Sequence, residues 1–230
     1  RRENVFLTEK NHLYTIKLKQ APQTVTLDPD YDVFRLLHAN ERPASLGRLF
    51  GAKKQLLVLP AKNTAEQTKA WQRLAATWSK RYNNVEVLYD DDHTNIQTAL
   101  AEGYAIWLLG WNNKLLKDQQ QRFNSPHTGS ISSPSSKTYS QTLTGNTATI
   151  GKQELQANKH AVVLLDAYTS RTPLGFIGAN EPDVIASIAR KLPHYSSYGV
   201  LAFELPEVNN IIKQHLPVLK SPMIWKSGQE

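Results

Sequence analysis

The stretch that decides the fold is QLLVL at Gln55–Leu59, which is followed by a helical pattern. This strand is apolar along its whole length, as is typical of a strand buried on both faces of a sheet. In the helix, Trp71, Leu74 and Trp78 recur at a spacing that places them on one face. A second strand, Val85–Tyr89, comes next. The segment therefore predicts a strand–helix–strand unit of a parallel sheet.

The alternation of strands and helices continues along the chain. We expect strands at 104–111, 161–166, 174–177 and 198–204, helices at 94–101, 113–123 and 183–192, and a last helix at 208–216. The strands at 161–166 and 174–177 are too close for a crossover helix, so they should form a hairpin. The predicted fold class is α/β, with a mostly parallel mixed sheet and helices on both faces, in a Rossmann- or flavodoxin-like layering.

The first 27 residues follow a different pattern. Short strands expected at 4–9, 12–18 and 24–27 would form an antiparallel β meander, which is too small to fold alone. Because the chain also begins without Met, we expect residues 1–27 to be the end of a preceding β-rich segment. Residues 28–230 would then be the α/β domain, opening with a turn and helix start at 28–32 and a short helix at 44–50.

One stretch inside the α/β domain is rich in Ser and Thr and poor in apolar residues. Residues 124–136 are therefore expected to form an exposed loop outside the core. After this loop, strands at 139–143 and 147–150 should form a hairpin about Gly145-Asn146.

Composition excludes several classes of protein. The net charge is +7, but the basic residues are scattered without a run of five, so we expect no nucleic-acid partner. Cysteine is absent, which excludes disulfides and thiolate zinc sites. No apolar run is long enough to span a bilayer, so we expect no transmembrane segment.

The common cofactor and metal motifs are also missing. Pro60–Asn63 stands where a glycine-rich phosphate loop would follow the first buried strand. No two histidines lie four residues apart, so a helical zinc pair is excluded. We therefore expect neither a cofactor nor a metal ion.

The first candidate ligand site is Asp90, Asp91, Asp92 and His93, directly after a strand. Open α/β sheets bind ligands at the carboxyl ends of their strands, and carboxylates with an imidazole can hold a hard cation or act as an acid–base pair. Alternatively, these acidic residues cap the next helix and stay solvated.

Two further candidates combine aromatic and polar side chains. Trp111 and Asn112 follow another strand and could hold a sugar or a peptide; alternatively, the Trp covers the sheet end and an Asn caps the next helix. His194 and Tyr195 join a helix to the last strand and could line a pocket. Their alternative is a turn whose aromatic ring packs against the sheet edge.

Three longer stretches together resemble a known family. They are LDPDYDVFRLL at 27–37, AIWLLGWNN at 105–113 and ARKLPHYSSY at 189–198. They resemble the C-terminal region of bacterial aminopeptidase N-like zinc metallopeptidases of the gluzincin group, over about residues 12–225. The zinc helix, its downstream Glu ligand and the amine-recognition motif of that family have no counterpart here, so no catalytic residue can be carried over.

The resemblance implies a non-catalytic C-terminal accessory module of a periplasmic or membrane-associated peptidase-like protein. Its partner would be the N-terminal catalytic domain of the same parent chain. Two other hypotheses stay open from the residues themselves. One is a stand-alone hydrolytic enzyme that uses the Asp90–His93 cluster. The other is a module that binds a small ligand or glycan at the carboxyl ends of the strands.

Overall fold

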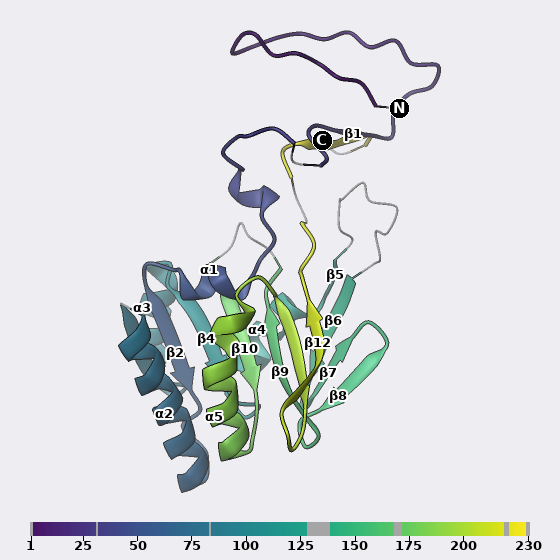
Figure 1. Ribbon diagram of the computed structural model, residues 1–230. Helices are drawn as coiled ribbons and strands as arrows, with labels where there is room; N and C mark the ends of the chain where they lie inside the picture. The colour runs from purple at the N-terminus through teal and green to yellow at the C-terminus, as the bar shows by residue number, and fades with distance from the viewer. Residues whose placement is uncertain are drawn as a thin grey trace.

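A seven-stranded sheet forms the centre of the chain in the computed structural model (Figure 1). The structure describes residues 2–30, 32–82, 84–127, 139–167, 172–218 and 221–228. The strands of the sheet are β2 (Gln55–Leu59), β3 (Val85–Tyr89), β4 (Ala105–Leu109), β9 (His160–Leu165), β10 (Leu174–Gly178), β11 (Val200–Glu204) and β12 (Asn209–Gln214). Their order is β12-β11-β9-β10-β4-β2-β3.

Both parallel and antiparallel pairs occur in this sheet. β2 pairs in parallel with β3 and β4, and β10 pairs in parallel with β4. β9 pairs antiparallel with β10 and β11, so the expected hairpin is confirmed. The prediction of an α/β fold with a large mixed sheet is therefore confirmed at the level of fold class.

The first strand–helix–strand unit forms where the sequence predicts it. Every residue of β2 is buried, and helix α2 (Ala65–Arg81) follows. The helix begins with a capping box: the Gln67 N–H donates to the Thr64 side chain at 3.2 Å, and the Thr64 N–H donates to the Gln67 side chain at 3.1 Å. These two bonds satisfy backbone donors that a helix start leaves open.

The other helices lie close to their predicted positions. They are α1 (Leu46–Phe50), α3 (His93–Ala101), α4 (Leu115–Phe123) and α5 (Pro182–Lys191), with short 3-10 turns η1 (Ala39–Glu41) and η2 (Leu192–Tyr195). α2 and α5 lie side by side in front of the sheet (Figure 1). The Trp78 indole N–H donates to the Ala189 carbonyl at 3.1 Å and links these two helices.

The predicted helix at 208–216 is wrong, because residues 209–214 form strand β12. Val208 has a left-handed φ of 57°, a backbone conformation that a β-branched residue rarely adopts and that no helix contains. The chain turns back there and pairs antiparallel with β11. Ile212 is buried while Ile211 is 38% exposed, as alternation along a strand requires.

A second, four-stranded antiparallel sheet lies beside the main one. Its strands are β5 (Ser125–His127), β6 (Tyr139–Thr144), β7 (Thr147–Ile150) and β8 (Gln153–Gln156), in that order. The predicted hairpin about Gly145-Asn146 is confirmed. The expected loop at 124–136 is wrong at its start, because Ser125–His127 pairs with β6. Residues 128–136 lie outside the described residues.

The predicted N-terminal meander is not formed. Residues 4–9 and 12–18 contain no strand, and only β1 (Thr24–Thr26) forms. β1 pairs with β13 (Ile224–Lys226) near the other end of the chain. A small hairpin is marginal in water without a surface to pack on, and residues 4–18 have no such surface here. The helix start expected at 28–32 is also absent from its described residues.

Part of the hydrophobic core is an aromatic cluster between α2 and the sheet. Trp71 and Trp78 are each 1% exposed, which confirms the predicted buried face of the helix. The Trp78 ring lies 5.0 Å from the Phe50 ring and 5.2 Å from the Trp107 ring, measured between centroids. α1 and β4 therefore meet α2 through these three rings.

Replacing Trp78 with Ala should lower the free energy of unfolding by about 3–5 kcal/mol, because it leaves a cavity in this cluster and removes the bond to Ala189. Urea unfolding followed by circular dichroism measures the change. Lys80→Ala, on the exposed face of the same helix, should change it by less than about 0.5 kcal/mol. Equal effects of the two substitutions would contradict the assignment of the buried face.

Candidate functional site: the strand ends and the N-terminal arm

Asp90 lies at the carboxyl end of β3, where the loops after β2 and β4 also meet. Its side chain is buried, with a residue exposure of 1%. One carboxylate oxygen accepts the Ala61 N–H at 3.0 Å, and the other accepts the Lys114 N–H at 2.8 Å. Asp90 therefore holds the two neighbouring loops together through their backbone.

The other three residues of the predicted cluster do not converge on a common point. Asp92 is the N-cap of α3 and accepts the Asn95 N–H at 3.3 Å. Asp91 and His93 are exposed. Among the described residues, no group of three His, Asp or Glu side chains is placed to hold a metal ion. The capping alternative thus describes Asp92, whereas Asp90 is a buried link between loops.

Trp111 is buried, not exposed as a platform for a sugar would require. It is 6% exposed, and its ring lies against Gly178, where a β-carbon would come within 2.5 Å of it. Asn112 donates from its side chain to the Asn63 side chain at 2.8 Å and to the Lys62 carbonyl. These contacts join the loops that follow β2 and β4, at the carboxyl ends of the two strands.

His194 and Tyr195 lie in η2, which precedes β11 and so lies at the amino ends of the parallel strands, opposite to Asp90. The Gly47 N–H of α1 donates to the Ser196 carbonyl at 2.7 Å, and α1 directly precedes the amino end of β2. His194 is exposed, and the Tyr195 ring packs edge-on against Phe203 with centroids 6.0 Å apart. His194 therefore cannot join His93, which follows the carboxyl end of β3, in one site.

A hollow that the sequence analysis did not identify lies at the carboxyl ends of β10 and β11. Its volume is about 540 Å³, and it is lined by residues 158–160, 181, 183–184 and 204–206. Strand ends are the expected place for ligands in such a sheet. In the sequence, the signal for this hollow is a pair of acidic residues near the ends of two predicted strands: Glu181 shortly after the strand at 174–177, and Glu204 as the last residue of the strand at 198–204.

Most of the exposed large apolar side chains of the described residues lie on the N-terminal arm, residues 2–37. In the extreme cases, Phe34 is 108% and Leu36 is 98% exposed relative to a free residue. We call this set of side chains the terminal surface; it comprises Val5, Phe6, Leu7, Leu13, Tyr14, Ile16, Leu18, Val25, Leu27, Val33, Phe34 and Leu36. Large apolar side chains exposed in such number on one segment are a feature of contact sites for other proteins.

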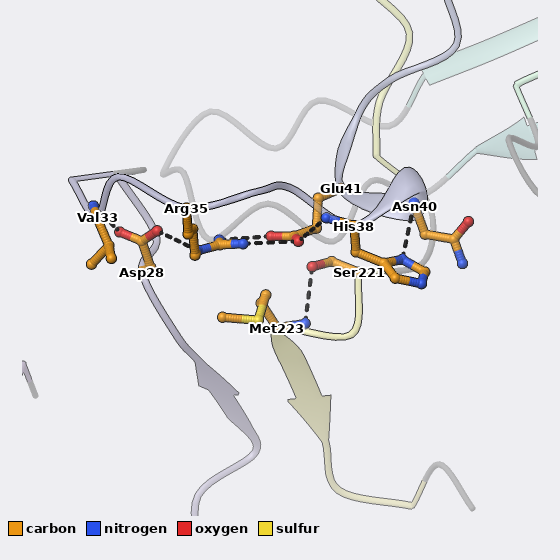
Figure 2. Close-up of polar contacts among 8 residues, drawn as sticks. All are labelled: Asp28, Val33, Arg35, His38, Asn40, Glu41, Ser221 and Met223. Carbon is orange, nitrogen blue, oxygen red and sulfur yellow. Dashed lines mark hydrogen bonds and ion pairs between the residues drawn. The ribbon is translucent and has the colours of Figure 1, made fainter. Parts of the chain in front are cut away.

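A salt-bridge cluster joins the end of the arm to the 3-10 turn η1 (Figure 2). The Arg35 guanidinium donates to both oxygens of Glu41, at 2.7 and 2.9 Å, and to Asp28 at 3.0 Å. Glu41 is 3% exposed and also accepts the His38 N–H at 2.8 Å. The hydrogen bonds from Arg35 lower the pKa of the Glu41 carboxyl, against the opposing effect of its burial.

The C-terminal segment joins the same assembly. The Leu27 N–H donates to the Met223 carbonyl at 2.8 Å, and the Ser227 N–H donates to the Gln23 carbonyl at 2.9 Å. These bonds extend the β1–β13 ladder at both ends. Both termini of the chain lie at this side of the molecule, at the top of Figure 1.

Comparison with known proteins finds no protein-family model and no curated protein that matches this chain. Over the residues that the structure describes, no helix has the length and apolar character needed to cross a membrane.

Replacing Asp90 with Ala should lower the free energy of unfolding by about 1–3 kcal/mol, because the Ala61 and Lys114 N–H groups lose their acceptors. Chemical denaturation of the purified variant measures this cost. Asp91→Ala is the matched control, since its side chain is exposed, and it should change stability by less than about 0.5 kcal/mol. If Asp91→Ala lowered the free energy of unfolding by about 1–3 kcal/mol and Asp90→Ala did not change it, Asp90 would not be the residue that links the loops.

Glu41 should make the stability of the chain depend on pH. Its pKa is lower in the folded than in the unfolded chain, so its contribution is present above the ordinary carboxyl pKa of about 4.3. It is lost as the pH falls through the lowered folded pKa. Glu41→Gln should therefore lower the melting temperature clearly at pH 7 and much less at pH 3.

The control for this measurement is Glu102→Gln. Glu102 forms an ion pair with Lys54 in which the two side chains are 48% and 50% exposed. Such exposed pairs contribute little, so the melting curves of this variant should follow the parent chain at both pH values. An equal response of both variants would contradict a special role for Glu41.

Proposed function

We propose that the chain is a non-catalytic accessory module that docks onto a β-rich neighbouring domain through its terminal surface. The exposure of the apolar side chains on the arm carries this proposal. The neighbouring domain would belong to a peptidase-like parent protein, as the resemblance implies. Its location would then be periplasmic or membrane-associated, following that of the parent.

The sequence and geometry of the arm both suit a sheet as the partner. Residues 12–18 alternate as a strand does, yet they form no strand in this chain. Residues 4–16 make no backbone–backbone hydrogen bond with another described residue. Unpaired backbone groups next to apolar side chains are what a strand offers to the edge of another sheet.

The strand ends support a non-catalytic role. Asp90 and Asn112 are occupied by contacts between loops, and Trp111 is packed against the end of β10. We also infer the doubly wound layering expected from the sequence. β3 and β4 lie on opposite sides of β2 in the sheet. The connection from β2 to β3 and the connection from β3 to β4 therefore run in opposite directions across the sheet. If both crossovers are right-handed, α2 and α3 lie on opposite faces of the sheet.

A second candidate function is small-ligand binding, which the hollow at the ends of β10 and β11 favours. Its size is within the range of sites for small molecules. A rise in melting temperature on addition of a ligand, lost when Glu204 is replaced with Ala, would support this function. The third hypothesis, a hydrolase using Asp90–His93, would be supported by stoichiometric zinc and turnover in the isolated chain.

Hydrogen exchange tests the accessory-module proposal. The parent protein that this proposal implies is compared with the 230-residue chain. Exchange of the amides of residues 4–16 should be at least roughly ten-fold slower in the parent protein, because docking would give them hydrogen-bond partners. Core amides of β2 should exchange equally in both. Equal exchange of residues 4–16 would refute docking through the arm.

A further inference from the structure

Strand β3 is an outer strand of the seven-stranded sheet, so one of its two backbone edges is open. The Asp90 N–H, directly after the strand, donates to the Leu59 carbonyl of β2 at 2.8 Å. Backbone groups of successive residues in a strand point alternately to its two sides. Val85, Val87 and Tyr89 therefore direct their backbone groups to the outer edge, where no described strand pairs with them.

The two edges of the sheet differ in how well they resist pairing with another strand. β12, at the other edge, carries the exposed Lys213 and pairs with β11 through a register shift. Lysine side chains and bulges are devices that protect sheet edges. β3 has the sequence VEVLY, with neither Lys nor Pro, and its Val87 and Tyr89 are 40% and 36% exposed. β3 is therefore the edge that is open to a further strand.

The order of residues in β3 suits pairing with a copy of itself. In an antiparallel pair centred on Val87, the two Val87 residues would face each other and exchange two hydrogen bonds. Val85 would stand opposite Tyr89, and Glu86 opposite Leu88. This register sets no like charges opposite each other and joins a β-branched to an aromatic side chain, a pairing that stabilises sheets.

The charges at the two ends of β3 are complementary as well. Lys80 and Arg81, both exposed in the last turn of α2, come before the amino end of the strand. Asp91, exposed, and Asp92, partly exposed, follow its carboxyl end. In the antiparallel pair, the acidic end of each copy meets the basic end of the other. The net charge of +7 opposes this less, because salt screens charges beyond about 8 Å.

The side of α2 that lies beside β3 leaves room for a second copy. The Gln72 side chain donates to the Tyr89 hydroxyl at 2.9 Å, so this side of the helix lies next to the edge strand. Ala76 and Ser79 follow Gln72 by four and seven residues, which places them on the same side of the helix. Both are small and exposed, so the α2 helices of two copies can approach each other.

We propose that the chain forms a symmetric dimer in which β3 of one copy pairs antiparallel with β3 of a second copy. The two seven-stranded sheets then become one continuous sheet. Such an interface is isologous, since the same surface serves both copies. It is separate from the arm and goes beyond the accessory role proposed above. Because one strand and one helix side form a small interface, we expect a weak dimer, with a Kd on the order of 10 μM.

Sedimentation equilibrium of the 230-residue chain tests the proposal. The mass should rise from 25.9 kDa towards twice that value as the concentration increases to roughly 300 μM, well above the expected Kd. Val87→Lys should raise the Kd by about ten-fold or more, because it sets two like charges opposite each other. Ile211→Lys, at an exposed position of the other edge strand, is the matched control and should leave the Kd unchanged.

A charge exchange tests the register without altering the strand. Arg81→Asp and Asp91→Arg should each raise the Kd by about ten-fold, because each substitution acts twice across the symmetric interface. The double variant restores opposite charges and should return the Kd to that of the parent chain. Melting temperatures establish that these variants of exposed residues stay folded.

Three results would overturn the proposal. The first is a mass of one chain over the whole concentration range. The second is a dimer that neither Val87→Lys nor the charge reversals weaken, because it would associate through another surface. The third is a double variant that stays as weak as the single ones, because the two ends of β3 would then not meet.

Discussion

The domain depends on one packing constraint at the centre of its sheet. Two tryptophans, Trp107 in β4 and Trp111 just after it, pack into the space left by two glycines of β10, Gly175 and Gly178. Trp107 stands opposite Gly175 in the parallel register. A β-carbon on Gly175 would come within 3.0 Å of the Trp107 ring and 2.8 Å of Leu49. Because interiors are close-packed, no other residue type fits there without displacing the ring. The position of Trp107 in turn places Phe50 and Trp78, and hence α1 and α2.

The same constraint closes the strand ends around Trp111. Trp111 covers the end of β10, and Gly110 beside it leaves room for the Pro60 ring. Open α/β sheets usually bind ligands at the carboxyl ends of their strands. Here the chain's own side chains fill that position at β2 and β4, and the hollow lies farther along, towards β11. Most of the exposed large apolar side chains lie on the arm.

Sequence reasoning succeeded where the pattern was long and the partner lay in the same domain. β2, α2 and the hairpin of β6 and β7 follow from periodicity, capping and turn residues alone. It failed at β12 because Val208, Ile211 and Ile212 fit both a helix and an edge strand. Only the free edge of β11 decides between the two, and that edge depends on tertiary structure.

The candidate site was less predictable because residue type does not determine how a side chain is used. The position of Asp90 after a strand favours a ligand-binding role. The same position also suits a carboxylate that accepts hydrogen bonds from the backbone N–H groups of neighbouring loops, and this is the role that Asp90 has. The arm shows the opposite case. Its pattern predicts three strands, and among the described residues only the last of them forms, as β1, although natural sequences normally agree with their fold at both levels. The same segment carries Phe34 and Leu36, the most exposed large apolar side chains among the described residues, so the unused strand pattern and the apolar exposure coincide on the arm.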